Sequence, residues 1–225
     1  MAGKKVRRVE AREGYDHWSE TYDGTPNPVV AMDARHTLDL LGPKPAEQIL
    51  DAGCGTGRNI ERMVMAGSHP VGIDFSGGML RVARRKTPDV PLARADLQKP
   101  LPLRADCFDA VLCALVGEHL DDLRAVFREL YGVLKPGGRL VFSVYHPEMA
   151  AAGIEANFER SGVEFRLGAS LHKVDDYMNT IEDAGFKRLA HYEFFGDEAL
   201  AGTIPVASKY LGFPLLLVIE AKKNE

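Results

Sequence analysis

The residues of this chain with the clearest chemical potential lie between positions 48 and 59. A short apolar run ends in Asp51, and glycines follow at positions 53, 55 and 57. We expect a strand that leads through a tight loop into a helix, because small residues let the backbone come close to a ligand. Gly53 and Gly55 also begin a dinucleotide fingerprint, whose third small residue would fall at position 58. Arg58 stands there instead, which counts against NAD because that small residue lets the helix pack on the strand.

Two further acids end predicted strands. Asp74 comes 23 positions after Asp51, close to the spacing of roughly 20 at which a carboxylate accepts both ribose hydroxyls. A carboxylate suits this role, because two adjacent hydroxyls can donate to its two oxygens. Asp96 follows the next predicted strand, at 91–95. The alternatives are an acid at a helix N-terminus for Asp74 and a loop cap for Asp96.

Three histidines could supply a base. His119 follows the predicted strand 108–114, His146 follows 139–145, and His172 precedes a predicted helix at 174–186. Because the carboxyl ends of parallel strands share one edge of a sheet, we expect these side chains at the same edge. An imidazole there can take a proton from a hydroxyl, an enol or an ammonium group, and the alternative is a polar lining residue. We rank His119 and His146 ahead of His172.

Strands and helices alternate along the chain, and this alternation positions the acids and the histidines. We expect strands at 48–52, 71–76, 91–95, 108–114, 139–145, 189–195 and 215–221, and helices at 15–22, 29–41, 59–66, 78–86, 121–134 and 174–186. The run at 108–114 is nearly continuously apolar, as in a parallel strand that is covered on both faces. The order predicts an α/β fold with a doubly wound sheet.

Two segments have no place in this sheet. Tyr15, Trp18 and Tyr22 recur at intervals of three and four residues, so they share one face of a helix. That helix either packs on the core or covers the site as a lid. The segment 148–173 follows the fifth predicted strand and reads as an inserted cover. The basic residues 1–12 are expected to form a solvated terminus.

Length and composition favour one domain inside the cell. The chain has 225 residues, of which 45% are apolar, and a net charge of −4, which suits a single core and is too acidic for a general nucleic-acid binder. Cys54, Cys107 and Cys113 form no CxxC pair, so we expect a reducing cytoplasm and neither a disulfide scaffold nor a bound metal. The longest apolar run, 213–219, is too short for a membrane span, and the N-terminus lacks the apolar region of a signal peptide.

In combination, the motifs resemble those of the class I S-adenosylmethionine-dependent methyltransferases. They are the glycine loop with its acid, the acid of the second strand, an Ala-Asp-Leu element at 95–97, a Phe-Asp strand start at 108–109 and a Lys-Pro-Gly-Gly turn at 135–138. Together they follow the order and spacing of that family over about residues 45–147. The outer segments are similar to its ubiquinone and menaquinone branch of small-molecule enzymes, in which a helix with two Tyr-Asp pairs covers the cofactor.

The resemblance implies a Rossmann-like sheet of seven strands, mostly parallel with an antiparallel last strand, in a single domain over 1–225. Lid helices would occupy about 13–41, the cofactor-binding core 45–147, a substrate cover 148–173, and a closing helix and strands 174–225. S-adenosylmethionine would lie across the carboxyl ends of the strands and leave as S-adenosylhomocysteine. Asp96 would accept from the adenine amino group.

The expected cofactor contacts are Tyr15, Tyr22, Asp51, Gly53, Cys54, Gly55, Thr56, Gly57, Arg58, Asp74, Phe75, Ser76, Met79, Asp96, Leu97 and Leu115. The expected acceptor contacts are Trp18, Glu118, Tyr145, Arg166 and Tyr177. The reaction would be an in-line displacement onto an O, N or C atom of a small, partly apolar acceptor. The partners would be that acceptor and no nucleic acid, in a monomer or homodimer. Two alternatives stay open: a non-catalytic S-adenosylmethionine-binding module or assembly partner, and an NAD-dependent oxidoreductase.

Overall fold

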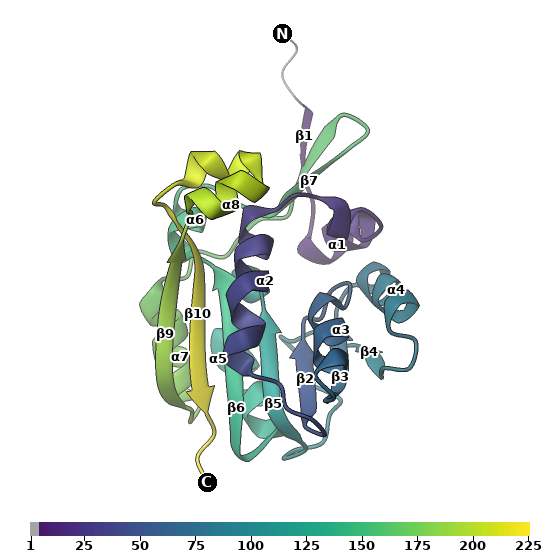
Figure 1. Ribbon diagram of the computed structural model, residues 1–225, viewed down its shortest axis with the longest axis vertical. Helices are drawn as coiled ribbons and strands as arrows, with labels where there is room; N and C mark the ends of the chain where they lie inside the picture. Colours follow the sequence, from purple (N-terminus) through teal and green to yellow (C-terminus); the bar gives the residue numbers. More distant parts are fainter. Residues whose placement is uncertain (1–4) are drawn as a thin grey trace.

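The computed structural model describes residues 5–225 and contains, within that range, a twisted sheet of seven strands (Figure 1). Across the sheet, the strands are β4 (Leu92–Arg94), β3 (His69–Asp74), β2 (Gln48–Ala52), β5 (Phe108–Ala114), β6 (Leu134–Tyr145), β10 (Pro214–Lys222) and β9 (Lys187–Phe195). The strands run parallel except β10, which is antiparallel to both of its neighbours. The sequence predicts both the doubly wound sheet and the antiparallel last strand, and the structure confirms them.

Helices cover both faces of this sheet. Behind it in Figure 1, α5 (Leu123–Val133) and α7 (Val174–Asp183) share a core with Val111 and Leu217. In front, α2 (Pro28–Leu41) and α8 (Glu198–Thr203) share a core with Leu112 and Val218. All four strand side chains are fully buried, which explains why β5 and β10 are apolar along nearly their whole length. The short layer beside β3 and β4 is formed by α3 (Arg58–Met65) and α4 (Gly77–Lys86).

Helix α2 belongs to this sandwich. Asn27 caps it by accepting from two amides of the first turn, and Gly42 ends it in the left-handed conformation, with φ 56°. Its buried face, which includes Met32, packs over β5, β6 and β10. The lid expected over 13–41 is therefore wrong for 28–41, because the sheet buries the apolar stripe of this helix.

A second, smaller sheet stands beyond the carboxyl ends of the main strands (Figure 1). Its strands are β1 (Lys5–Arg8), β7 (Asn157–Arg160) and β8 (Val163–Arg166). β1 pairs in parallel with β8, and β7 and β8 form a hairpin within the segment 148–173. Residues 5–8 are exposed to solvent, as expected for the segment 1–12, but they pair with β8 and so form a strand that the sequence did not predict, while 1–4 lie outside the described residues.

Helix α1 (Ala11–Trp18) follows β1 and lies between the two sheets (Figure 1). Trp18 at its end stacks on Phe158 of β7, with ring centroids 5.2 Å apart. The remaining short helices are η1 (Tyr22–Gly24), η2 (Gly117–His119), α6 (Pro147–Ala151) and η3 (Pro205–Tyr210). Since α1 packs on the hairpin, the two segments that have no place in the main sheet form one unit above it.

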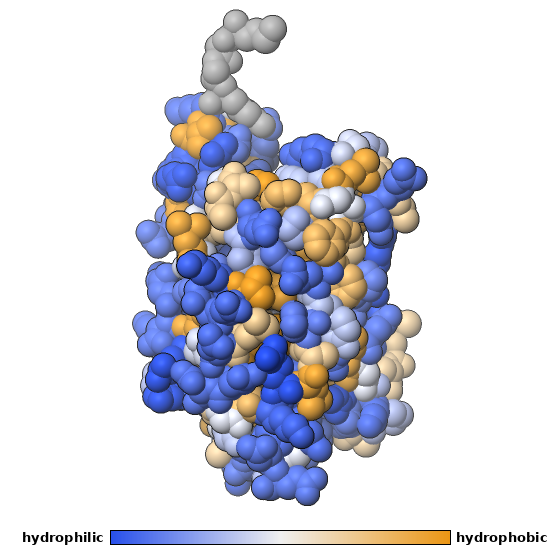
Figure 2. Space-filling model, turned by 90° about the vertical axis from the view of Figure 1, so that its left-hand side faces the viewer, coloured by the Kyte–Doolittle hydropathy of each residue, from blue (hydrophilic) through white to orange (hydrophobic). Residues whose placement is uncertain are grey.

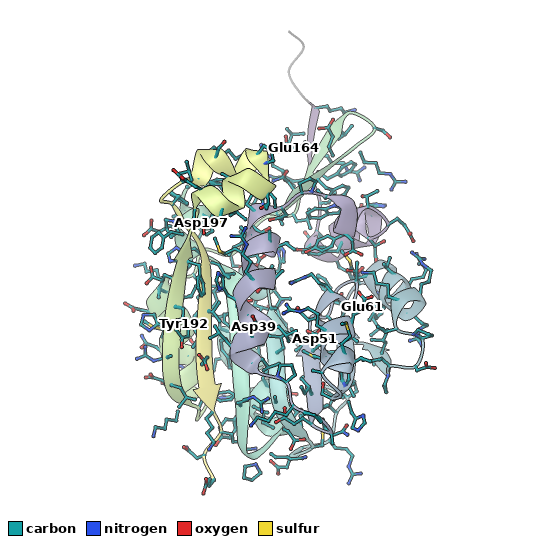
Figure 3. All side chains as sticks on the ribbon, in the orientation of Figure 1. Asp39, Asp51, Glu61, Glu164, Tyr192 and Asp197 are labelled. Atoms are coloured by element: carbon teal, nitrogen blue, oxygen red, sulfur yellow. The ribbon has the colours of Figure 1, made fainter. Side chains whose placement is uncertain are left out.

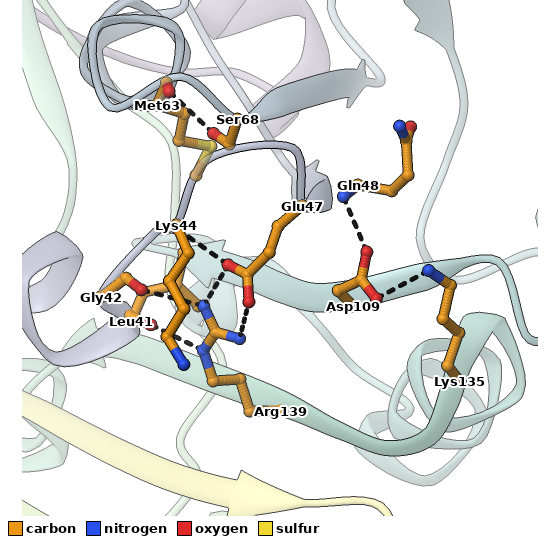
Figure 4. Close-up of polar contacts among 10 residues, drawn as sticks. All are labelled: Leu41, Gly42, Lys44, Glu47, Gln48, Met63, Ser68, Asp109, Lys135 and Arg139. Atoms are coloured by element: carbon orange, nitrogen blue, oxygen red, sulfur yellow. Dashed lines mark hydrogen bonds and ion pairs between the residues drawn. The ribbon is translucent and has the colours of Figure 1, made fainter.

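Ion pairs hold the opposite end of the main sheet (Figure 4). Arg139 donates to both carboxylate oxygens of Glu47, at 2.8 and 2.7 Å, and to two carbonyl oxygens at the end of α2. These bonds fix the loop from α2 to β2.

β6 begins at Leu134, earlier than expected, because Leu134 pairs with Phe108 before the residues 135–138 leave the ladder. The predicted turn is therefore an irregularity within β6.

Figure 2 shows the molecule from the side of the edge strand β9. Apolar residues on and near this strand, such as Leu189, Phe195 and Leu211, are about half exposed and are mixed with hydrophilic residues. Scattered side chains of this kind are normal on protein surfaces. Within residues 5–225, each helix is too short or too polar to cross a membrane.

A buried acid on α2, Asp33, ties the layers together. Its Oδ1 accepts from the hydroxyls of Thr37 and Ser143, both at 2.6 Å, and its Oδ2 accepts from Nη2 of Arg58 at 2.5 Å. Thr37 lies on the same helix, Ser143 on β6, and Arg58 at the start of α3. This carboxylate therefore joins α2, β6 and the loop after β2 through charge-assisted hydrogen bonds.

Replacing Asp33 by alanine is expected to lower the free energy of unfolding by about 3 kcal/mol or more, because Arg58 and Ser143 lose a buried acceptor. Asp39→Ala is the matched control on the same helix. Asp39 is exposed and pairs with Arg62, so we expect a loss below about 1 kcal/mol. Urea unfolding followed by circular dichroism measures both variants, and equal losses would contradict the central role of Asp33.

Candidate active site

The loop after β2 forms the floor of the site. Gly53, Gly55 and Gly57 have φ values of 84°, 53° and 84°, in the region that favours glycine. The amide of Gly53 donates to the carbonyl oxygen of Ile73 at 2.8 Å, which holds the loop against β3. A Cβ atom at Gly53 would lie 2.3 Å from Cγ1 of Val116. Both the backbone conformation and the close approach of the loop after β5 therefore require glycine at position 53.

Asp74 ends β3 beside this loop. Its Oδ2 accepts from the amide of Gly55 at 2.9 Å, and its Oδ1 accepts from the amide of Ser76 at 2.8 Å. Burial raises the pKa of the carboxyl group to about 6, although the two amides act in the opposite direction. Each oxygen keeps a second lone pair. The carboxylate that positions the loop can therefore still accept from a ligand.

A pocket of about 860 Å³, its open mouth included, lies above these elements. Of the expected cofactor contacts, its lining includes Tyr15, Tyr22, Gly53, Cys54, Gly55, Thr56, Arg58, Asp74, Phe75, Met79, Asp96, Leu97 and Leu115, and His119 joins them. Three expected contacts do not line it. Gly57 is the N-cap of α3, Ser76 caps α4 by accepting from the amide of Met79, and Asp51 lies buried at the end of β2.

Asp51, labelled in Figure 3, lies between α2 and α3. It is 1% exposed, and neither of its carboxylate oxygens has a hydrogen-bond partner within residues 5–225. Burial raises its pKa to about 7, with Asp74 and Asp33 acting in the same direction and Arg58 against it. Nη1 of Arg58 is also buried and has no partner in the described chain, although Nη2 binds Asp33. A buried acid and a buried guanidinium nitrogen, both without a partner in the described chain, therefore flank the loop after β2.

Helix α1 forms the roof of the pocket and is held at two points. The hydroxyl of Tyr15 lies 2.9 Å from Nε2 of His119. Oδ1 of Asp16 accepts from the amide of Gly78 at 2.8 Å and from the hydroxyl of Ser76 at 2.6 Å, at the N-terminus of α4 where a carboxylate is favourable. Burial lowers the pKa of His119 to about 4, so this imidazole is neutral near pH 7. Helix α1 is therefore held over the pocket by a neutral contact between Tyr15 and His119 and by the hydrogen bonds of the Asp16 carboxylate at the start of α4.

A narrower chamber adjoins the pocket across η2. Its lining includes Glu118, Tyr145, His172 and Tyr177, which the sequence predicts near the acceptor. Glu118 is 4% exposed, neither of its oxygens has a hydrogen-bond partner within the described residues, and burial raises its pKa to about 7. Nε2 of His172 donates to the carbonyl oxygen of Leu120 at 2.6 Å. His172 therefore already holds the loop after η2.

Trp18 lies away from the pocket, in an open groove of about 830 Å³ on the other side of the chamber. Its Nε1 donates to the hydroxyl of Thr25 at 3.1 Å. Tyr145 lines both the chamber and this groove, and its hydroxyl accepts from Nδ2 of Asn27 at 2.7 Å. Tyr145 therefore lies at the boundary between the chamber and the surface groove.

Two expected residues lie elsewhere. His146 is buried at the start of α6, where Nδ1 accepts from the amide of Glu148, and its Nε2 lies 3.3 Å from Oε2 of Glu193 on β9. Arg166 on β8 donates to Glu164 at 2.7 Å and lines neither the pocket, the chamber nor the groove. We therefore remove His146 from the candidates for a base and Arg166 from the acceptor contacts.

The sequence interpretation missed Asp16 and Val116. Asp16 follows Tyr15 in a Tyr-Asp pair, so its position beside an expected lid residue was visible, but its contact with α4 depends on the fold. No pattern in the sequence indicated that Val116 would lie beside the glycine loop. Asp96 lines the pocket, and its Oδ1 also accepts from the amide of Gln98 at 3.0 Å, so the loop-cap alternative describes part of its role. Within residues 5–225, no three metal-ligating side chains gather into a metal site.

Comparisons with known proteins agree with this geometry. A family model described as "Methyltransferase domain" matches residues 50–142. An uncharacterized methyltransferase of Emericella nidulans is 32% identical, over 82% of this chain and 78% of that protein. A demethylmenaquinone methyltransferase of Streptomyces avermitilis is 35% identical over 147 residues, 63% of each chain. The crystal structure of an S-adenosylmethionine-dependent methyltransferase from Mesorhizobium loti superposes with a TM-score of 0.73 at 25% identity, covering 88% of this chain and 100% of the other.

The sheet order and the glycine loop define a class I methyltransferase fold. The chain belongs to the class I S-adenosylmethionine-dependent methyltransferases, and it is similar to demethylmenaquinone methyltransferases over part of their length. It spans less than two thirds of the length of the demethylmenaquinone methyltransferases that it matches.

The raised pKa of Asp51 should make the stability of the unliganded protein depend on pH. Between about pH 4, the unfolded value, and about pH 7, the folded chain keeps a proton that the unfolded chain has lost. Unfolding therefore releases a proton, and raising the pH through this window destabilises the fold. At each pH, the measured quantity is the melting temperature of Asp51→Asn minus that of the wild type. We expect this difference to rise from about pH 4 to about pH 8, because the variant has no carboxyl group to lose the proton. Exposed Asp89→Asn is the control, and a difference for Asp51→Asn that stays constant across the range would contradict the assignment.

Proposed function

We propose that this protein binds S-adenosylmethionine beneath α1 and transfers its methyl group to a small, partly apolar acceptor. The observation that carries the proposal is a pair of buried groups without hydrogen-bond partners in the described chain. They are Nη1 of Arg58, a residue that lines the pocket, and the carboxylate of Asp51, which lies behind the lining at the end of β2. The methionine end of the cofactor carries one ammonium and one carboxylate group, which are the charges that these two side chains need. The residues present therefore fit the cofactor.

The other end of the pocket suits a nucleoside. Asp74 keeps lone pairs for two ribose hydroxyls, and Asp96 stands where it would accept from an adenine amino group. Met79, Leu97 and Leu115 line the same pocket with apolar surface for the base. S-adenosylmethionine supplies a methyl group on a positively charged sulfur, which leaves as a thioether. The acids and apolar side chains of this chain therefore supply binding and orientation.

Alignment and exclusion of water are the main tasks left to the protein. Holding two reactants in line can contribute about 7 to 11 kcal/mol, and α1 covers the pocket in which this must happen. Burial keeps His119 neutral, with a pKa of about 4, so its role is to hold Tyr15 and the roof. A base is needed only if the acceptor must lose a proton before it attacks.

Calorimetry with S-adenosylmethionine tests the proposal directly, and absence of binding would overturn it. In Asp74→Ala, two ribose hydroxyls lose their shared acceptor, so we expect the affinity to fall by about 1.5 to 3 kcal/mol. The control is Asp175→Ala, an exposed acid on α7. Wild-type affinity in Asp74→Ala would remove Asp74 from the site. With labelled cofactor, methylation of bulk tRNA, DNA or protein without any small acceptor would contradict a small-molecule substrate.

Deleting residues 1–24 removes β1, α1 and η1 but no strand of the main sheet. We expect a folded protein with sharply lower cofactor affinity and turnover, because the pocket loses its roof and lids of this kind often govern turnover. Thermal unfolding, calorimetry and a methyl-transfer assay measure the three quantities. Tyr15→Phe is the companion variant that removes only the hydroxyl beside His119. Normal binding and turnover of the truncated protein would make α1 ordinary packing, and failure to fold would make it part of the core.

A further inference from the structure

Glu118 is a buried acid that the proposed cofactor contacts do not use. Its side chain is 4% exposed, and neither carboxylate oxygen has a hydrogen-bond partner within residues 5–225. In the described chain, the basic nitrogen within 4 Å is Nε2 of His119, at 3.9 Å from Oε1. His119 is neutral near pH 7 because burial lowers its pKa. Glu118 therefore has no cation to compensate its charge.

The chamber around Glu118 favours a cation over an anion. Tyr145 and Tyr177 contribute aromatic rings, whose faces attract ammonium groups. A second acid in the lining, Glu155, is already compensated, since it lies 3.2 Å from Nη2 of Arg8 and accepts from the amide of Gly168. Within residues 5–225, the lining of the chamber contains no lysine or arginine. A buried carboxylate in such surroundings gains most from a cationic ligand.

The size of the chamber limits what can enter it. Its free space holds roughly one water molecule, which is also the size of a primary ammonium head group. The adjoining groove is much larger, and apolar residues such as Val29, Met149 and Phe158 line part of it. The chamber and the groove share the lining residues Tyr145, Ile154, Glu155 and Ala156, so they are neighbours. The two spaces together fit a small polar head attached to an apolar body.

We infer that the methyl acceptor is a primary amine with an apolar body, and that its ammonium group binds Glu118 among the rings of Tyr145 and Tyr177. This inference rests on the methyltransferase activity proposed above, and it narrows the acceptor atom to nitrogen. The apolar body lies in the groove beside Trp18. Because Glu118 also lies next to His119, which lines the cofactor pocket, the amine is held at the junction of the two sites.

Glu118 has a second task in this assignment, because an ammonium group has no lone pair for attack. The carboxylate takes one proton from the ammonium group, which leaves a neutral amine. The lone pair of the amine forms the bond to the methyl carbon while the carbon–sulfur bond breaks and its electron pair stays on sulfur. The products are an N-methylammonium ion and the thioether. The proton on Glu118 passes to water when the site opens.

The experiment compares phenethylamine and hexylamine with the alcohols of the same carbon skeleton, using labelled S-adenosylmethionine and the full chain. We expect label in the amines and none in the alcohols. Glu118→Gln keeps the size of the side chain and should lower kcat/KM for the amines by about 100-fold or more, since a hydrogen-bonded charge is lost. Its dissociation constant for S-adenosylhomocysteine should stay within about threefold of wild type, because Glu118 does not line the cofactor pocket. Glu182→Gln, the same change on the exposed face of α7, is the matched control.

Ligand binding gives a readout that does not depend on turnover. The amines should raise the melting temperature of the wild-type complex with S-adenosylhomocysteine, and this shift should be absent in Glu118→Gln. Methylation of the alcohols in place of the amines, amine turnover that survives Glu118→Gln, or the absence of any amine-dependent shift would each overturn the inference. So would a loss of cofactor affinity in Glu118→Gln that matches the loss of amine activity. If Glu118→Gln does not fold, the comparison of amines with alcohols on the wild-type protein still shows whether the acceptor is an amine. A wild-type protein that fails to bind S-adenosylhomocysteine would instead overturn the proposed function itself.

Discussion

The carboxylate of Asp33 is the interaction on which the site depends. It is almost fully buried, and it joins α2, β6 and the first residue of α3 in one network. Arg58 is therefore drawn toward α2, so its long side chain does not separate α3 from the sheet. This explains how the motif accommodates a cation where a dinucleotide fold needs a small residue. The same guanidinium keeps its Nη1 unpaired at the floor of the pocket, so one ion pair both holds the fold and orients a binding group.

Unpartnered buried groups gather at the carboxyl ends of the strands. Arg58 lines the pocket, Asp51 lies buried behind it at the end of β2, and Glu118 lies across η2 in the adjoining chamber. In the absence of ligand, each group lowers the stability of the fold, because a buried polar group without a hydrogen bond costs about 1 to 3 kcal/mol. A ligand that makes these hydrogen bonds would remove the penalty. A fold can therefore be less stable without its ligand because its binding groups are buried and unpaired. A ligand that supplies these missing partners is therefore expected to stabilise the protein.

The roof couples two parts of the chain that are far apart in sequence. Asp16 binds the start of α4, while Trp18, two residues further along α1, stacks on Phe158 of the hairpin formed by β7 and β8. A movement of α1 therefore disturbs both the pocket and the hairpin that covers the groove. Since the same helix contacts both, a displacement of α1 would alter the pocket and the groove together.

The sequence by itself determined the seven strands of the main sheet, most of the helices and their alternation along the chain. Apolar runs predicted the strands, and the glycines predicted the loop at 53–57. Asp74 was recognised at the end of its strand. Each of these predictions depends on a pattern of neighbouring residues in the sequence. The tertiary structure decided that α2 is a core helix, that 5–8 form a strand, and that His146 and Arg166 lie outside the site. It also decided that the carboxylate of Glu118 has no hydrogen-bond partner among residues 5–225. The physical reason is that the surroundings of a side chain are made by distant segments, whose arrangement a local pattern of residues does not contain.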